Sequence, residues 1–138
     1  MSGEGYSRED KIILPNDDTD LETHFSIQDY ADVATDNNVY VSQSATGQYA
    51  TFLFKDILLA ENNVVNITCK ARASIAPSSS TVYLQIYNRN LSSWETKTSN
   101  SVTAANVKFT MSYTLNNLSD YKDINGWIAC RVYQEATA

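Results

Sequence analysis

Hydrophobic and polar residues alternate along several stretches of the chain. Between residues 65 and 73, apolar residues occupy every odd position and polar residues every even position. Between residues 81 and 87 the two faces carry different side chains, namely Val82, Leu84 and Ile86 on one and Tyr83, Gln85 and Tyr87 on the other. A period of two is the repeat of a β-strand with one buried face. The pattern therefore predicts strands over both stretches.

Further strands are expected at 11–15, 39–42, 49–54, 91–98, 107–115 and 127–133, whereas 21–33 fits either a helix or a strand. Segments rich in Ser, Asn and Asp, which favour turns, separate them, and no helix longer than two turns is expected. The 138 residues suit one domain. The prediction is an all-β fold, a single jelly-roll-type β-sandwich of about eight strands over 11–138, with an extended N-terminal arm over 1–10.

Both cysteines fall on the apolar faces of predicted strands. Cys69 belongs to the strand at 65–73 and Cys130 to the strand at 127–133. The first interpretation is a pair of buried, unreactive thiols. The second is a disulfide between neighbouring strands, because the two faces could meet in one core.

Charge is distributed unevenly along the chain, whose formal net charge is −6. Residues 1–38 contain most of the acidic residues and only two bases, whereas the remainder is slightly basic. No Lys/Arg cluster matches a phosphate backbone, so nucleic-acid binding is not expected. The acidic segment is interpreted first as a solvated surface, with a calcium loop or an arm that docks on a basic neighbour as alternatives.

Calcium is the metal that the acidic segment suggests. Asp18, Asp20 and Glu22 alternate along the chain, and Asp36–Asn38 or the pair Asp120 and Asp123 could complete a shell of oxygen ligands. The spacing does not match an EF-hand loop. The alternative is an Asp-rich turn whose carboxylates bond to their own backbone amides.

From about residue 48 onward, the order of features resembles galactose-binding-like jelly-roll modules of the discoidin and carbohydrate-binding type. The resemblance is carried by residues 81–88, by Ser93-Trp94-Glu95-Thr96, by residues 107–115 and by the closing segment 121–133. It covers roughly 90 residues and implies a fold far more than a role. Members of this group often carry one structural Ca²⁺, and the sugar-binding members place aromatic platforms on loops at one rim. Trp94 and Trp127 instead fall in or beside predicted strands.

Catalytic chemistry is not expected. The single histidine, His24, lies in the acidic segment away from both cysteines in sequence, and a surface or capping role is its first interpretation. Strand-borne acids that could form a glycosidase pair are scarce, and no Cys/His set suits zinc. The sequence predicts a protein that is not an enzyme and needs no cofactor, apart from a possible structural Ca²⁺.

Contacts with other molecules are assigned to two groups of residues. In the N-terminal segment they are Tyr6, Arg8 and Ile12, and in the sandwich they are Tyr83, Tyr87 and Trp94. Outward tyrosines are common in protein interfaces, although cross-strand aromatic pairs also stabilise a sheet. For Trp94, packing is the first interpretation and stacking on a sugar the second.

The leading functional hypothesis is a decoration or accessory protein of a phage-like virion or another repeated surface assembly. It would bind copies of itself or a lattice protein through its sandwich and its arm. Deletion of residues 1–10 is then expected to abolish that binding and leave the fold intact. The alternative is a carbohydrate-binding accessory module of an extracellular protein.

The expected location is the virion or the cell exterior. No apolar run approaches the roughly 18 residues of a membrane helix, and the first residues lack the basic and apolar regions of a signal peptide.

Overall fold

Eight β-strands make up most of the described part of the chain. The computed structural model describes residues 5–11, 13–19, 21, 23–24, 26, 28–29, 43, 49–57 and 64–135. The strands are β1 (Gly5–Lys11), β2 (Thr23–His24), β3 (Tyr49–Ile57), β4 (Val64–Ala71), β5 (Val82–Asn88), β6 (Ser93–Asn100), β7 (Phe109–Asn116) and β8 (Trp127–Glu135). A short 3-10 helix, η1 (Leu118–Asp120), lies between β7 and β8. The all-β prediction is confirmed.

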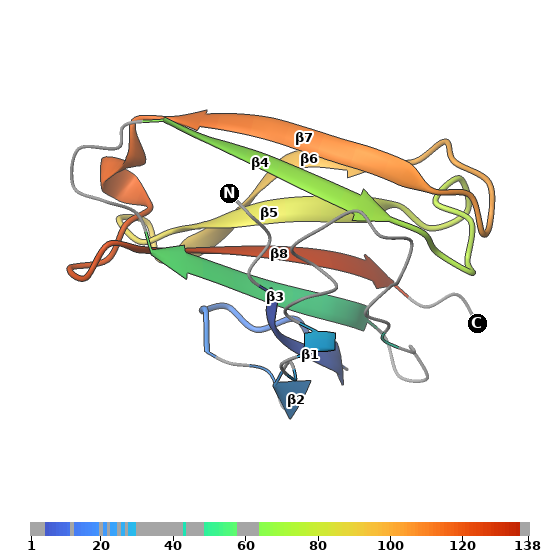
Figure 1. The fold of residues 1–138 in the computed structure, drawn as a ribbon, viewed down its shortest axis with the longest axis horizontal. Helices are drawn as coiled ribbons and strands as arrows, with labels where there is room; N and C mark the ends of the chain where they lie inside the picture. Colours follow the sequence, from blue (N-terminus) through green and yellow to red (C-terminus); the bar gives the residue numbers. More distant parts are fainter. Residues whose placement is uncertain are drawn as a thin grey trace.

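The strands form two antiparallel sheets (Figure 1). The larger sheet has the order β2-β1-β3-β8-β5-β6, and the smaller sheet consists of β4 and β7. Strands β3 and β8 pair over their full length, from Tyr49 opposite Glu135 to Ile57 opposite Trp127. Strand β8 therefore lies in the middle of the larger sheet, where both of its edges are paired.

Side chains from both sheets meet in one main core. The smaller sheet contributes Val65, Ile67, Phe109, Met111 and Leu115, and the larger sheet contributes Val82, Leu84, Ile86, Ile128, Cys130 and Val132. Ile86 and Ile128 are 0% exposed. Because each buried large aliphatic side chain is worth about 1.5–3 kcal/mol, this cluster supplies most of the driving force for the sandwich. The inward faces predicted from the alternation are confirmed.

The predicted strand at 11–15 is wrong. Lys11 is the last residue of β1, and residues 13–15 are not in a strand. Pro15 presents its carbonyl oxygen to Arg131 instead of a neighbouring strand, because the chain turns there to cross the sheet. The predicted strand at 39–42 lies outside the described residues.

An extended N-terminal arm was expected over residues 1–10, and the structure corrects this expectation for residues 5–10. These residues belong to β1, which pairs with β3 on one side and with β2 on the other. A strand is held by backbone hydrogen bonds, so the polar side chains of this segment do not prevent it from joining the sheet. The buried hydroxyl of Ser7 also accepts the backbone N–H of Leu21. The predicted boundary at residue 10 therefore falls inside a strand.

No helix in the described ranges is long and apolar enough to cross a lipid bilayer.

Candidate functional site

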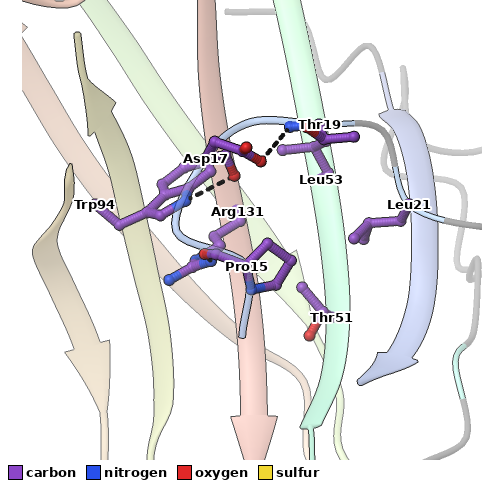
Figure 2. A pocket seen from close by; sticks show the side chains of 8 residues that line it. All are labelled: Pro15, Asp17, Thr19, Leu21, Thr51, Leu53, Trp94 and Arg131. Atoms are coloured by element: carbon purple, nitrogen blue, oxygen red, sulfur yellow. Dashed lines mark hydrogen bonds between the residues drawn. The ribbon is translucent and has the colours of Figure 1, made fainter. Parts of the chain in front are cut away.

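The larger sheet has a second buried surface on its outer face, the side turned away from the main core. A small apolar cluster packs there, formed by Leu21, Leu53, Tyr87 and Ala129, with Trp94 half-buried against them. Residues 13–19 cross this outer face, and these residues together with Leu21 are here named the strap (Figure 2). The molecule thus has the smaller sheet, the larger sheet and the strap in successive layers.

Hydrogen bonds from sheet side chains hold the strap by its backbone. Arg131 Nη1 donates to the carbonyl oxygen of Pro15 at 2.7 Å, and Trp94 Nε1 donates to the carbonyl oxygen of Asp17 at 3.1 Å. Figure 2 shows both side chains beneath the strap. Since both acceptors are backbone atoms, these bonds depend on the path of the strap more than on its side chains.

Arg131 is the centre of the outer face. It is 6% exposed, and its guanidinium lies 4.4 Å from the ring centroid of Trp94 and 5.5 Å from that of Tyr133. Its Nε donates to Oε1 of Gln85 at 2.7 Å. Burial lowers the pKa of Arg131 to about 10. Among the described residues it forms no ion pair, so aromatic faces and neutral oxygens stabilise its charge.

The space beneath the strap is small. A hollow of about 10 Å³ is lined by Pro15, Asp17, Thr19, Leu21, Thr51, Leu53, Trp94 and Arg131 (Figure 2). That volume holds about one water molecule. With the strap in place, the hollow is too small for a sugar or a cofactor.

Beyond the strap, three tyrosines from neighbouring strands form a continuous row, the tyrosine row. Tyr133 of β8 stacks on Tyr83 of β5 with ring centroids 5.1 Å apart. On its other side Tyr133 meets Tyr49 of β3 edge to face, at 5.8 Å. All three rings are half-buried. Stacking against one another fixes their orientation, so they form a pre-ordered aromatic surface on a rigid sheet.

The predicted sandwich contacts therefore differ in their environments. Tyr83 is part of the accessible row, whereas Tyr87 is 8% exposed and packs against Trp94 at 5.2 Å. The guanidinium of Arg89 lies 5.5 Å from the Tyr87 ring. Trp94 contacts both Arg131 and the strap, which agrees with packing as its first interpretation. Tyr87 is thus a packing residue, because the strap turns this part of the outward face into an interior.

The predicted N-terminal contacts are described only in part. Arg8 lies in β1, and its Nη1 donates to Oε1 of Gln43 at 3.2 Å. The backbone of Tyr6 belongs to β1, but its side chain, like all of Ile12, lies outside the described residues. Contacts of these residues with another molecule stay a prediction.

The acidic turn binds its own chain. The Asp17 carboxylate accepts the backbone N–H of Thr19 at 3.1 Å, which lowers the pKa of Asp17. Asp18 forms an ion pair with Arg89 at 2.8 Å. Asp20 and Glu22 lie outside the described residues, and within the described part no group of three His, Cys, Asp or Glu side chains is placed to hold a metal. The calcium site stays a prediction.

A polar cluster that the sequence did not indicate closes the main core beside β6. The Tyr121 hydroxyl donates to Oε1 of Glu95 at 2.6 Å, and Lys97 Nζ lies 3.1 Å from that hydroxyl and 3.0 Å from Oε1 of Glu95. Hydrogen bonding from Tyr121 lowers the pKa of Glu95, with Lys97 and Asn88 acting in the same direction. Lys97 also lies over the rings of Tyr113 and Tyr121. Only the alternation of β6, which brings Glu95 and Lys97 to the core side, could have suggested this cluster.

The two cysteines lie in or against the main core. Cys69 and Cys130 are free, and Cys130 is 2% exposed. Burial raises the pKa of each thiol to about 12, so both stay protonated at neutral pH. The backbone of His24 belongs to β2, and its side chain lies outside the described residues.

Comparisons with known proteins give no relative. No family model matches the chain, and no curated protein or solved structure matches it either.

Proposed function

We propose that this chain is a non-enzymatic structural and adhesive module, a decoration or accessory protein of a phage-like virion or another repeated surface assembly. Its fold is proposed to be a jelly roll of the galactose-binding-like type, acting at the virion or the cell exterior. Its partners are copies of itself or a lattice protein.

The tyrosine row is the observation that carries this proposal. Tyr49, Tyr83 and Tyr133 form a pre-ordered aromatic surface on three neighbouring strands of one sheet. Tyrosine gives a large contact area at a low cost in side-chain entropy, and its hydroxyl can bond to a wet surface. Such a row suits a protein that works by contact.

The contacts with neighbouring subunits that were first expected of the N-terminal arm are assigned here to the sandwich surface. Residues 5–11 are paired with the chain's own β3, so within this molecule they cannot clasp a neighbour without leaving the sheet. Contacts through the tyrosine row need no such rearrangement.

A carbohydrate-binding accessory module, with or without calcium, is the second candidate. One specific observation favours it: the N-terminal segment pairs with its own sheet. Contact between this segment and a neighbouring subunit is therefore no longer an argument for assembly. Aromatic rings on a rigid sheet also suit the faces of sugar rings.

The test compares self-association with glycan binding for the wild-type chain and for Tyr83→Ser. Sedimentation velocity from about 10 μM to about 1 mM covers the range of weak protein contacts. Tyr83→Ser should weaken the association about tenfold or more, whereas Tyr83→Phe, which keeps the stacked ring, should weaken it much less. Thermal unfolding of each variant controls for loss of fold.

A glycan array, read with and without a chelator, is the second measurement. Binding to a glycan that is lost in Tyr83→Ser, with no self-association, would replace the assembly proposal by the carbohydrate-binding one. Association that Tyr83→Ser leaves unchanged would remove the tyrosine row from the proposal. A chain that neither associates nor binds a glycan contradicts both.

A further inference from the structure

Exposed aliphatic side chains gather at the two ends of the sandwich. Among the described residues, the large hydrophobic side chains that stand in solvent are Ile13, Val64, Leu91, Val102, Val107 and Ile124. Strand directions place three of them near each end. The Ile124 end carries Val64, Leu91 and Ile124, and the Val102 end carries Val102 and Val107. Ile13 is near the Val102 end because it lies two residues after Lys11, which pairs with Tyr49 there. Figure 1 shows these ends at the left and at the right of the view.

The turn that carries Ile124 is held rigidly. Oδ1 of Asp123 accepts the backbone N–H groups of Asn125 and Trp127, at 2.8 and 2.9 Å. The backbone of Asp123 also pairs with Trp127 and Gly126, each at 3.0 Å, and Gly126 has the positive φ of 87° that this turn requires. Ile124 is nevertheless 99% exposed. A fixed backbone thus presents a fully solvated apolar side chain.

The neighbouring turn that carries Leu91 is tied to the same end. The backbone N–H of Leu91 bonds to Oδ1 of Asn88 at 3.0 Å. The backbone N–H of Arg89 bonds to the carbonyl oxygen of Asp120 at 2.8 Å, and Arg89 Nε bonds to that of Tyr121 at 3.0 Å. Leu91 and Ile124 therefore belong to one pre-ordered surface.

The Val102 end is built in a similar way. Oδ1 of Asn100 accepts the N–H groups of Val102 and Thr103, at 3.2 and 3.1 Å. The carbonyl oxygen of Thr103 accepts the N–H of Ser78 at 3.2 Å, and Asn106 bonds through its N–H to Ala73 at 2.7 Å. These bonds join the loops 72–81 and 101–108, so this apolar surface is also fixed before any contact is made.

Charge at the two ends favours attraction between them. The loops of the Val102 end carry Arg72 and Lys108, and the acid Glu135 lies beside them at the end of β8, where its carbonyl oxygen accepts the Ser80 hydroxyl. At the Ile124 end, Asp120 and Asp123 face Arg89 and Lys122, and Asp18 adds a third acid through its ion pair with Arg89. Counted over these described residues, bases outnumber acids by one at the Val102 end and acids outnumber bases by one at the Ile124 end, so the two aliphatic surfaces differ in the sign of their charge.

We infer that the Ile124 end of one copy docks on the Val102 end of the next copy, in a head-to-tail contact. This inference rests on the proposed role in a repeated assembly. Because the two ends are different surfaces, such a contact is heterologous and builds a ring or an open chain. A few side chains at each end bury less than the roughly 1,200 Å² of a stable pair, so each contact is weak and is strengthened by repetition. Rigid turns lower the entropic cost of forming it.

Two variants, each blocking one end, test this geometry. Ile124→Asp places a charge on the first end and Val102→Asp on the second, at positions that are 99% and 80% exposed, so the fold should tolerate both. Ser112→Asp adds the same charge at an exposed site in the middle of β7 and is the matched control. The measurement is the mean mass by sedimentation velocity up to about 1 mM, the range of weak contacts.

Head-to-tail docking gives a distinctive result. With Tyr83→Ser as the background, which removes the tyrosine-row contact, the chain and its Ser112→Asp variant should still associate beyond a dimer or into a closed ring, and each end variant should stay monomeric. An equimolar mixture of Ile124→Asp and Val102→Asp should form a 1:1 dimer that does not grow, because the contact uses the single unblocked end of each copy.

Other outcomes overturn the inference. If Val102→Asp alone dimerises, the Ile124 ends pair with each other, and if Ile124→Asp alone dimerises, the Val102 ends do. If Tyr83→Ser alone abolishes association while both end variants of the wild type associate as before, the tyrosine row makes the whole contact, so the proposed function stands without this inference. A wild type that stays monomeric rules the contact out, and the glycan array then decides whether the carbohydrate-binding candidate replaces the assembly proposal.

Discussion

The two cysteines illustrate how burial alone determines the chemistry of a residue. Cys130 lies in the main core, and Cys69 packs against that core from the opposite sheet. Desolvation is the largest cause of the raised pKa of both thiols, and for Cys130 the nearby Cys69 and Asp56 act in the same direction. A thiol that cannot ionise is a poor nucleophile, so these residues contribute volume to the core and no reactivity.

Both thiols should therefore resist modification by a disulfide reagent at pH 8 while the protein is folded. They should react fully in guanidinium chloride, which the absorbance of the released thiolate measures. Fast reaction of Cys130 in the folded state would contradict its burial.

The same shift predicts a loss of stability in alkali. A folded-state pKa of about 12 lies above the ordinary thiol value near 9, so the unfolded chain releases these protons first as the pH rises. The free energy of unfolding should therefore fall as the pH increases from about 9 towards 12. A Cys69→Ala, Cys130→Ala double variant should lose that part of the pH dependence, and denaturant titrations at several pH values test it.

Among the elements, the strap gives the outer face of the larger sheet its unusual composition. Gln85 and Arg131 are buried polar residues on strands whose other face is aliphatic. They are satisfied because they bond to each other and Arg131 also bonds to the strap backbone. The strap and this polar pair thus depend on each other, since either alone would leave buried groups without partners.

Arg131→Ala should loosen the strap. It removes two hydrogen bonds and the stacking on Trp94, and we expect a loss of about 2–4 kcal/mol in the free energy of unfolding. Cleavage within the strap by a protease should become faster, and the fluorescence of Trp94 should shift to longer wavelength. Asp18→Asn, which removes only the partly exposed ion pair with Arg89, should cost no more than about 1 kcal/mol. Equal effects of the two substitutions would argue against Arg131 as the anchor.

Strand β6 shows how an edge of the larger sheet is protected. A β-bulge interrupts its register with β5 between Leu84 and Gln85, so Lys97 has no direct partner on β5. Lys97 points to the core side, where it meets Glu95 and Tyr121. A bulge and an inward-pointing charge are two features that prevent edge strands from pairing with other chains. Contacts between copies are therefore assigned to the sheet face and the ends of the sandwich, away from this edge.

For the whole molecule, the N-terminal segment is part of the larger sheet. Strand β1 pairs with β3 from Lys11 opposite Tyr49 to Gly5 opposite Phe54, and Ser7 is 0% exposed. The sheet order places β1 between β2 and β3, so its removal also detaches β2.

Deletion of residues 1–10 should therefore destabilise the fold, in contrast to the expectation for a free arm. The long edge of β3 would become unpaired, which favours aggregation. Thermal unfolding and sedimentation of the shortened chain test this, with the full chain as the control. An unchanged unfolding midpoint would restore the interpretation of this segment as an appendage.

The sequence alone was sufficient to predict the strands that have one apolar face and the residues that form the main core. In β4, β5, β7 and β8 the alternation is regular, and each inward face packs as expected because the period of two follows directly from strand geometry. It also assigned both cysteines to the interior. The same reasoning predicted the candidate site only in part. Tyr83 is accessible as expected, but Tyr87, which was expected on the same exposed face, is buried.

The role of residues 1–21 depended on the folded chain. Polar residues can form a strand wherever a neighbouring edge offers backbone partners, and local sequence does not say where such an edge lies. The strap likewise covers Trp94 and Arg131 through hydrogen bonds between residues more than seventy positions apart. Tyr87 is buried in the same apolar cluster as Leu21 of the strap. Alternation reports the two faces of a strand, but only packing between distant segments decides which of those faces remains in contact with water.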